Sequence, residues 1–410
     1  MNKAIGGLVV AVTLGVGLAL GIVAGGVISP DESPAPVAVA SSSPSPSATP
    51  EPTASPSPSA SPSAEPTPEP SPTAPPSPTP EPSPSLVPAP LTGTLVTPEV
   101  AKRHVIAVMI DDQFAARPQS GLTSASVVWQ APAEGGIPRY MALFQEGSPK
   151  AVGPVRSSRY YFIAWAAEWK SVYVHVGGSP QALALLRSPK GKGKVVYDAD
   201  GFRYEGRYLW RIKTRFAPHN VYSDAKHLRT MAKKVGAKNS GYKSPWLFAP
   251  DKPLAYRPKG DSIVVPYLAN RITYKYDRKS NTYLRSVTGE SKQTDASSKK
   301  RVAPKNVVVM LVRFGPLNDG SKKHRLEAQF TGKGVAWIAT NGKTIKGEWR
   351  KKSMTGPTRF YDKKGKQVTF TVGQTFIQVI PSTFRPIIKN GKMPPPPPIG
   401  INGSPGPLVK

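Results

Sequence analysis

Arg156 and Arg159, three residues apart, mark the stretch of the sequence best suited to bind an anion. A guanidinium forms bidentate, charge-assisted hydrogen bonds with phosphate or carboxylate groups, and Ser157 adds a hydroxyl between the two arginines. Arg117 and Arg139, each beside a proline, are candidates for the same site. The pattern predicts an anion clamp. The alternative is that these arginines pair with acids of the protein and stabilise the fold.

A helix start follows the arginines. Ser179 has the side chain of a helix cap, and Pro180 suits the first helical position. Gly177 and Gly178 would let a ligand come close to the backbone. Because free N–H groups at a helix N-terminus attract anions, the segment predicts a second part of the same pocket. The alternative is a tight strand-to-helix turn with ordinary capping.

Acids and histidines of the same region are candidates for proton transfer. Asp111 and Asp112 end an apolar run, at the edge where open α/β sheets place their ligands. They are candidate general bases, as is Glu134 beside two glycines. His219 lies in a Pro-His-Asn loop, whereas His175 lies inside an apolar strand and suits a hydrogen-bonded core role. The alternative for the acids is to cap helices or pair with arginines.

Motifs of common cofactor and metal enzymes are missing. The sequence has no cysteine, P-loop, Rossmann fingerprint, HExxH pair or Gly-x-Ser-x-Gly elbow. It therefore excludes disulfides and a thiolate nucleophile, and we expect no cofactor and no metal site. A Ser-His-acid triad built on Ser157 or Ser179 is an alternative without a supporting motif.

Two folded domains are predicted, with an α+β fold overall. Residues 100–250 alternate strand and helix patterns, as in an α/β domain, and residues 251–385 alternate polar and apolar positions between turns, as in a mostly β domain. The predicted strands are His104–Ile110, Ser126–Gln130, Arg139–Gln145, Ser171–Val176, Arg271–Asp277, Thr282–Val287, Asn306–Phe314, Glu327–Phe330, Val335–Thr340, Thr344–Arg350, Gln367–Thr371 and Thr375–Ile380; the predicted helices are Tyr160–Trp169, Pro180–Leu186 and Ser223–Val235, the last capped by Ser223.

The two ends of the chain differ from these domains. Residues 4–29 form an uncharged apolar run long enough to span a bilayer as a helix, and Lys3 before it predicts export of everything that follows. A signal peptide cleaved after residues 38–40 is the alternative. Residues 30–95 are rich in Pro, Ser and Thr and predict a disordered stalk, and the tail 386–410 is also predicted to be disordered. The expected location is a single pass through the cell membrane, with both domains outside the cytoplasm.

The charge of the chain is concentrated in the folded part. The formal net charge is +30, and only Lys3 of the 55 lysines and arginines precedes residue 101. Such a surface favours polyanions: nucleic acid, anionic membrane, or phosphate-bearing wall polymers. Because the domains are expected outside the cytoplasm, an anionic cell-wall polymer or an envelope protein is the expected partner, and nucleic acid is not.

Short segments throughout the two domains resemble the YerB-like family of bacterial cell-surface proteins, which includes lipoproteins. The resemblance implies an α/β domain followed by a β-rich domain and a surface location, and it brings no established reaction. The chain departs from the family at Asp112, where an amide is expected, and in having no cysteine to carry a lipid. It also lacks the histidine expected beside Asp295. The matching segments are Ala107–Asp111, Ala116–Leu122, Glu134–Arg139, Gly153–Arg159, Val174–Leu183, Ala217–Asn220, Tyr283–Arg285, Lys305–Val308, Gly347–Trp349 and Val372–Gln378.

Three functions remain open from the sequence. The first, which we favour because no catalytic motif is present, is a membrane-anchored module that binds an anionic envelope ligand or a wall-synthesis partner. The second is a transferase or hydrolase acting on a phosphorylated or glycan wall polymer, with Arg156 and Arg159 holding the anion and an acid or His219 moving the proton. The third is binding of extracellular nucleic acid, which the charge alone allows.

Overall fold

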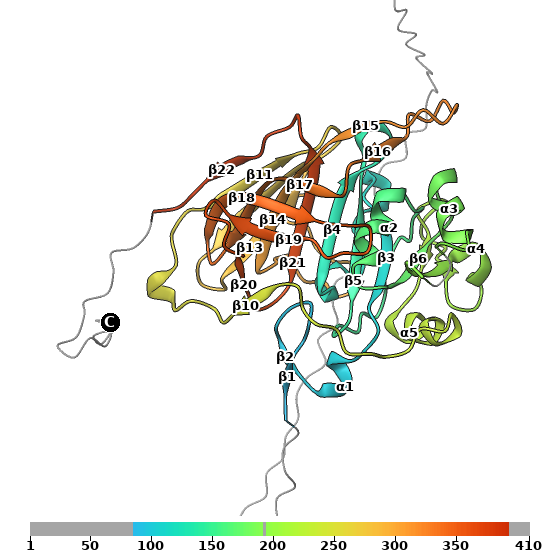
Figure 1. Ribbon diagram of the computed structural model, residues 1–410, viewed down its shortest axis with the longest axis horizontal. Coiled ribbons are helices and arrows are strands. Elements are labelled where there is room, and N and C mark those ends of the chain that lie inside the picture. The colour runs from blue at the N-terminus through green and yellow to red at the C-terminus, as the bar shows by residue number, and fades with distance from the viewer. Residues whose placement is uncertain (1–84, 192–193, 393–410) are drawn as a thin grey trace, which may run out of the picture. The chain divides into compact units, whose positions relative to one another are not determined.

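A ten-stranded β-sheet organises the part of the chain that the computed structural model describes, residues 85–191 and 194–392 (Figure 1). Both halves of the chain contribute strands, because β21 pairs in parallel with β4, with Thr375 opposite Val127. The two domains therefore share one sheet, which the sequence did not indicate. From edge to edge the strands are β19 (Arg359–Asp362), β18 (Lys343–Lys351), β17 (Gly332–Thr340), β14 (Asn306–Val312), β21 (Thr375–Pro381), β4 (Val127–Pro132), β5 (Pro138–Phe144), β3 (Ile106–Asp111), β6 (Val172–His175) and β7 (Tyr197–Asp200).

The central strands are buried on both faces. Every residue of β3, β4, β5 and β14 is buried, which explains why these strands are continuous apolar runs in the sequence. A second sheet alternates buried and partly exposed positions instead, as expected of a sheet with one face toward solvent. That sheet contains β13 (Thr282–Val287), β12 (Arg271–Asp277), β11 (Ser262–Pro266) and β22 (Ile387–Lys389).

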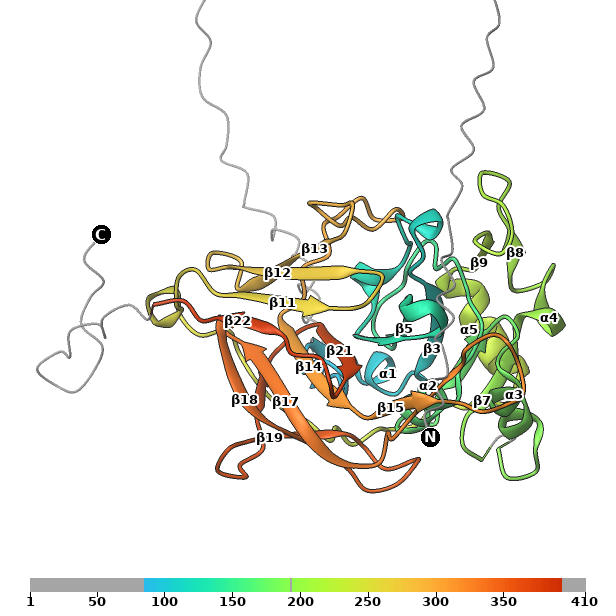
Figure 2. The same ribbon diagram turned by 90° about the horizontal axis from the view of Figure 1, so that it is seen from above.

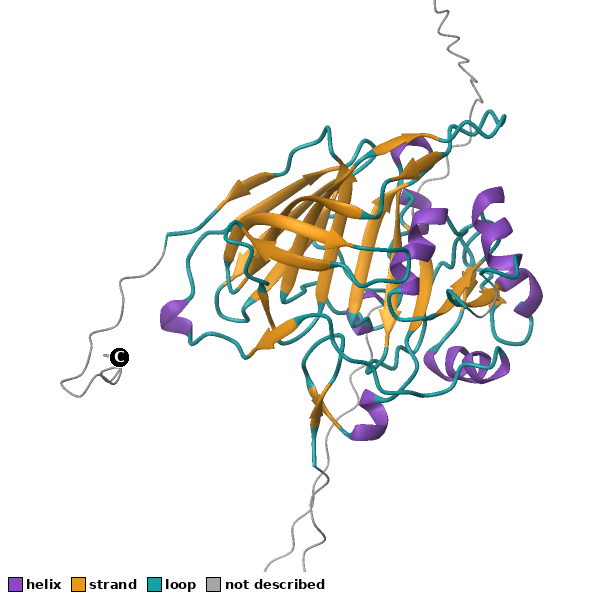
Figure 3. Cartoon of the chain, in the orientation of Figure 1, coloured by secondary structure: helices purple, strands orange, loops and turns teal. Residues whose placement is uncertain are grey.

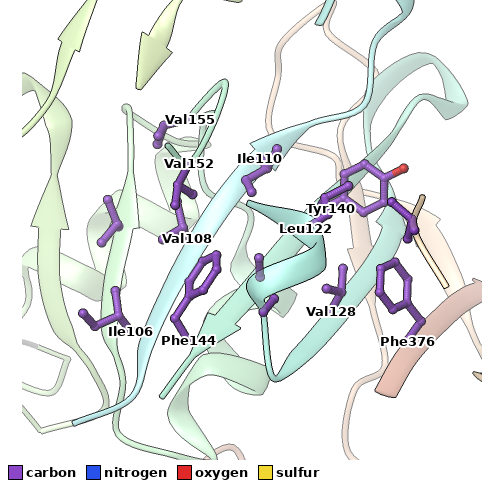
Figure 4. Close-up of a cluster of buried hydrophobic side chains, with 14 of the residues drawn as sticks. Ile106, Val108, Ile110, Leu122, Val128, Tyr140, Phe144, Val152, Val155 and Phe376 are labelled. Atoms are coloured by element: carbon purple, nitrogen blue, oxygen red, sulfur yellow. The ribbon is translucent and has the colours of Figure 1, made fainter. Parts of the chain in front are cut away.

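Two apolar layers cover the ten-stranded sheet. On one face, Val108, Tyr140 and Phe376 belong to a cluster that also contains side chains of β11 to β13 and of helix α5 (Ala225–Lys234) (Figure 4). Figure 2 shows β11 and β12 in a layer separate from β17 and β18. On the other face lie helices α2 (Tyr160–Ala167) and α3 (Pro180–Arg187). There Trp129 of the sheet stacks on Trp165 of α2, with ring centroids 4.8 Å apart, a contact worth about 1 kcal/mol beyond its area.

The α-helices all lie in the first half of the described chain, and Figure 3 shows in purple that most of the helical segments gather on one side of the strands. The described residues after 250 form strands and one 3-10 turn, so the fold is mostly β and has two domains. Short helices α1 (Pro98–Ala101) and α4 (Gly201–Tyr204) accompany the three longer ones, and further two-stranded pairs are β1 (Val87–Pro88) with β2 (Leu95–Val96), β8 (Trp210–Arg211) with β9 (Val221–Tyr222), β10 (Leu247–Ala249) with β20 (Thr369–Thr371), and β15 (Phe314–Pro316) with β16 (Leu326–Ala328).

The structure corrects several predicted boundaries. The stalk predicted over 30–95 ends earlier, because β1 pairs with β2 and Leu91 is fully buried. The tail predicted to be disordered over 386–410 includes β22, which pairs with β11, so residues 387–389 are ordered, and residues 393–410 lie outside the described residues. The cap of α5 is Asp224, whose side chain accepts the N–H of His227; Ser223, the predicted cap, donates instead to a backbone carbonyl.

The predicted membrane anchor at 4–29 and the stalk up to residue 84 lie outside the described residues. Within 85–191 and 194–392, no helix is both long enough and apolar enough to cross a membrane.

Candidate functional site

The residues that the sequence singled out meet at one edge of the ten-stranded sheet. Strand β3 is parallel to β6, and both β3 and β4 run antiparallel to β5, so the carboxyl ends of β3, β4 and β6 lie at the same edge. Asp111 ends β3 and Asp112 follows it, Glu134 follows β4, and Gly177 follows β6. Arg139 of β5 lies opposite Asp111. Ligands of open α/β sheets bind at such an edge.

Asp111 lies between a histidine and an arginine. Its Oδ2 is 2.8 Å from Nδ1 of His219 and 3.0 Å from Nε of Arg156. A carboxylate accepts hydrogen bonds, so Nδ1 of His219 is placed to donate to Asp111, and Nε2 is the ring nitrogen left for a bound group. His219 and Arg156 keep 14% and 24% of their side-chain exposure. This arrangement can accept a proton at Nε2 from a bound group and offers a cation beside it.

Asp112 serves the fold, in contrast to the general base that the sequence allowed. Its side chain has no exposed surface and bonds to Arg117 and Gln119 through Oδ1, and to Gln130 and Asn270 through Oδ2. Burial raises the pKa of Asp112, and the charge of Arg117 opposes that rise. Arg117, only 3% exposed, is likewise unavailable to a ligand.

Glu134 binds two of the predicted anion-binding arginines. Arg159 donates from Nε at 2.6 Å and also from Nη2, so the pair is bidentate, and Arg139 donates from Nη2 at 3.4 Å. Burial favours a higher pKa for Glu134, but the hydrogen bond and charge of Arg159, with the charge of Arg139, hold that pKa below its ordinary value. Burial and the Arg159 charge lower the pKa of Arg139 to about 10. The protein itself thus supplies the anion for this pair of arginines.

The backbone N–H groups around the start of α3 donate to acceptors within the protein. Ser179 accepts a backbone N–H from the first turn of α3 at 3.4 Å, as expected of a cap. The N–H of Gly177 donates to Asp200 at 3.0 Å, and the N–H of Ser179 donates to the carbonyl of Ser158 at 3.1 Å. A Cβ at Gly178 would lie 3.2 Å from Ser158. These contacts match the structural alternative, in which the glycines serve a tight turn.

Ser157 and His175 do not bond to each other, and each contacts other parts of the fold. Ser157 is half-buried, and its carbonyl accepts a bond from Arg139 at 2.9 Å. His175 is fully buried, with Nδ1 2.8 Å from the carbonyl of Gly177 and Nε2 2.8 Å from Asp198. Among the described residues, neither Ser157 nor Ser179 bonds through its hydroxyl to a histidine, so this edge contains no Ser-His-acid triad.

A cavity of about 790 Å³ opens beside Glu134 at the same edge. It lies among the residues that follow β4 and β21 and the hairpin of β15 and β16. One wall is polar, because Arg325 bonds to Asp319 and its Nε is 4.0 Å from Oε1 of Glu134. The remaining walls include Leu268 and Phe384.

Sequence reasoning missed this cavity because its walls come from segments far apart in the chain. One local signal was present: residues 318–320, Asn-Asp-Gly, have the composition of a tight turn and connect β15 to β16. That signal predicts a hairpin, but it does not predict which strand ends the hairpin covers.

The edge is not arranged as a metal centre. No group of three or more His, Asp or Glu side chains in residues 85–191 and 194–392 is positioned to hold a metal ion. Asp111 and His219 form a pair that Arg156 completes with a positive charge.

Residues 91–238 match the family described as "Protein of unknown function (DUF3048) N-terminal domain", and residues 263–377 match its C-terminal domain. A protein of Bacillus subtilis (strain 168) named "Putative lipoprotein YerB" is 32% identical over 312 residues, which cover 74% of this chain and 89% of the relative. The crystal structure of YerB from Bacillus subtilis matches with a TM-score of 0.65 and 29% identity, over 74% of this chain and 99% of that one. The resemblance is confirmed, and the chain belongs to the YerB-like family of two-domain proteins.

Proposed function

We propose that this protein is held at the outer face of the cell membrane and binds an anionic ligand of the cell envelope without transforming it. The relative's name describes a lipoprotein, and lipoproteins are attached to a membrane surface. In this chain, which has no cysteine, the apolar run at 4–29 would take the place of the lipid.

One observation carries the proposal: the positive charge of the folded part is not neutralised from within. All but one of the 55 lysines and arginines follow residue 100, together with only 18 of the 25 acids. Many of those acids are already paired, as Glu134 is with Arg159 and Asp112 with Arg117. The surplus cations therefore face outward and attract polyanions.

Co-sedimentation with purified bacterial walls tests this function. The described residues, 85–191 and 194–392, all belong to one compact unit, and a fragment of residues 79–410 can be produced without the apolar run. We expect the unit to sediment with walls, and to do so less after phosphate-bearing polymers are stripped or when salt is raised, because salt screens exposed charges. Failure to sediment at low salt, or sedimentation indifferent to both treatments, contradicts the proposal.

A second candidate function is favoured by the contact of Asp111 with His219. A histidine oriented by a carboxylate at Nδ1 is the usual form of a general base, and Arg156 lies where it can hold an anionic substrate. The reaction class would be transfer or hydrolysis at a phosphorylated or glycan polymer.

Replacing His219 separates the two candidates. His219→Gln removes the base and introduces no charged side chain. If the protein only binds, the variant sediments with walls and restores a deletion strain as the wild type does. If the second candidate is right, wall binding persists while restoration fails.

A further inference from the structure

A cluster of five basic side chains lies at the opposite edge of the sheet from the Asp111 site. They surround an open cavity of about 640 Å³ and are here called the basic cleft: Arg103, Lys150, Lys226, Arg229 and Lys233. Arg103 precedes β3 and Lys150 follows β5, so both lie where β3 begins and β5 ends; the other three belong to helix α5. None of the five was singled out by the sequence.

The two arginines of the basic cleft are positioned by backbone carbonyls. Arg229 donates to the carbonyl of Gln145 at 2.6 Å and to that of His104 at 3.4 Å, and Arg103 donates to the carbonyl of Glu146 at 3.3 Å. Burial and the charge of Arg103 lower the pKa of Arg229 to about 10. The fold thus holds two like charges together, and the charge of Glu146 offsets their repulsion only in part. A bound anion would relieve the rest.

No carboxylate of the described chain forms an ion pair with this cluster, although the charge of Glu146 acts on Arg229 from a greater distance. None of the five side chains has a nitrogen within 4.0 Å of an Asp or Glu oxygen, which is the longest distance for an ion pair. Asp224, which also lines the cavity, accepts from the N–H and Nδ1 of His227 at 2.8 and 2.9 Å. The carboxylate of Glu146 is bound by the hydroxyls of Thr92 and Ser126. At the other edge, by contrast, Arg159 has Glu134 as a partner.

We propose that the basic cleft is the site that binds the phosphate groups of an anionic envelope polymer. This inference rests on the proposed function and gives it a place and a ligand class. Two guanidiniums suit phosphate oxygens, and Lys150, Lys226 and Lys233 extend the positive surface beyond them. The cavity is far larger than one phosphate group, so a chain of phosphodiesters fills it better than a single small anion does.

The test uses the full chain in a non-ionic detergent. Binding of fluorescent poly(glycerol phosphate) is measured for the wild type, for the double variant Lys150→Glu, Lys226→Glu, and for a control, Lys352→Glu, Lys363→Glu. All four lysines are exposed, so the variants should fold, and both doubles change the net charge equally. We expect the cleft variant to lose about tenfold or more in affinity and the control to lose much less.

Each of the other outcomes contradicts one part of the proposal. Equal losses in the two double variants would show that binding is spread over the surface and would exclude the basic cleft as the site. Equal, cleft-dependent binding of polyglutamate of the same length would exclude selectivity for phosphate. Cleft-dependent binding to phosphatidylglycerol vesicles but not to the polymer would identify a lipid headgroup as the ligand instead. If the wild type binds neither the polymer nor purified walls, the proposed function itself fails.

Discussion

Arg159 and Arg229 illustrate two roles of a partly buried guanidinium. Arg159 forms a bidentate pair with Glu134, so its charge is neutralised inside the protein. Within the described part of the chain, Arg229 bonds only to carbonyl oxygens, which orient the guanidinium but leave its charge in place. Residue type and spacing in the sequence do not distinguish these two roles. The role of each arginine depends on whether a carboxylate lies beside it, and that carboxylate comes from another part of the chain.

Glu134 should stabilise the protein only where it is ionised. Glu134→Gln leaves Arg139 and Arg159 without their carboxylate and should lower the free energy of unfolding by about 2 kcal/mol near neutral pH. Because the folded pKa of Glu134 lies below its ordinary 4.5, the loss should be full above 4.5 and shrink as the pH falls below it. Urea unfolding across this range measures the effect. Glu348→Gln, a partly exposed acid paired with the exposed Arg350, is the control and should cost little.

Asp261 should destabilise the protein where it is ionised. The residue is fully buried, and neither carboxylate oxygen has a hydrogen-bond partner of good geometry among the described residues, although the backbone N–H of Ser262 and the hydroxyl of Thr344 lie near enough to favour its ionised form. Burial raises its pKa from 3.8 to about 7. The side chain therefore destabilises the folded state increasingly as the pH rises from 3.8 towards 7. Asp261→Asn should therefore raise the free energy of unfolding by roughly 1 to 2 kcal/mol at about pH 8 and by little near pH 4.

Asp277→Asn is the matched control for Asp261. A hydrogen bond from Ser280 lowers the pKa of Asp277, so this variant should lose stability above 3.8 rather than gain it. If Asp261→Asn is no more stable than the wild type at about pH 8, the ionised side chain of Asp261 does not destabilise the fold as expected.

At the scale of elements, local chemistry determined the helix and hairpin ends that could be predicted. Ser179 and Pro180 start α3 as expected, and the Asn341-Gly342 turn joins β17 to β18. The cap of α5 was assigned one residue too early because Ser223 and Asp224 are both good caps, and only the tertiary bond of Ser223 to the carbonyl of Tyr208 distinguishes them.

Gly342 should be intolerant of substitution because it faces the second sheet. Its φ is +72°, and a Cβ there would lie 2.2 Å from the ring of Tyr276 in β12. Gly342→Ala should cost backbone strain of about 1 kcal/mol and a further, larger cost from the clash. Gly206→Ala, at φ +82° with no atom near its Cβ, should cost the strain alone. Equal losses in thermal unfolding would contradict this role.

At the scale of the whole molecule, the sequence indicated the order of the elements but not how the two domains join. The alternation of residues 271–287 predicted β12 and β13 closely. Nothing local predicted that β21 would insert beside β4, because strand pairing depends on contacts between residues some 250 positions apart. The candidate residues did meet at one edge, but their ion pairs could not be read from spacing, since Glu134 and Arg159 belong to different elements.

The shared sheet implies that the two domains fold as one unit. Alone, residues 85–250 would expose the edge of β4 and leave polar groups without partners: Gln130 bonds to Arg285 at 2.7 Å, and Asp112 to Asn270 at 3.1 Å. An unpaired strand edge promotes aggregation, and unpartnered buried polar groups cost about 1 to 3 kcal/mol each. We therefore expect residues 85–392 to unfold in a single transition monitored by circular dichroism. Residues 85–250 alone should show no cooperative transition unless residues 251–392 are added, and a stable, cooperatively unfolding 85–250 fragment would show that the sheet joins two independent domains.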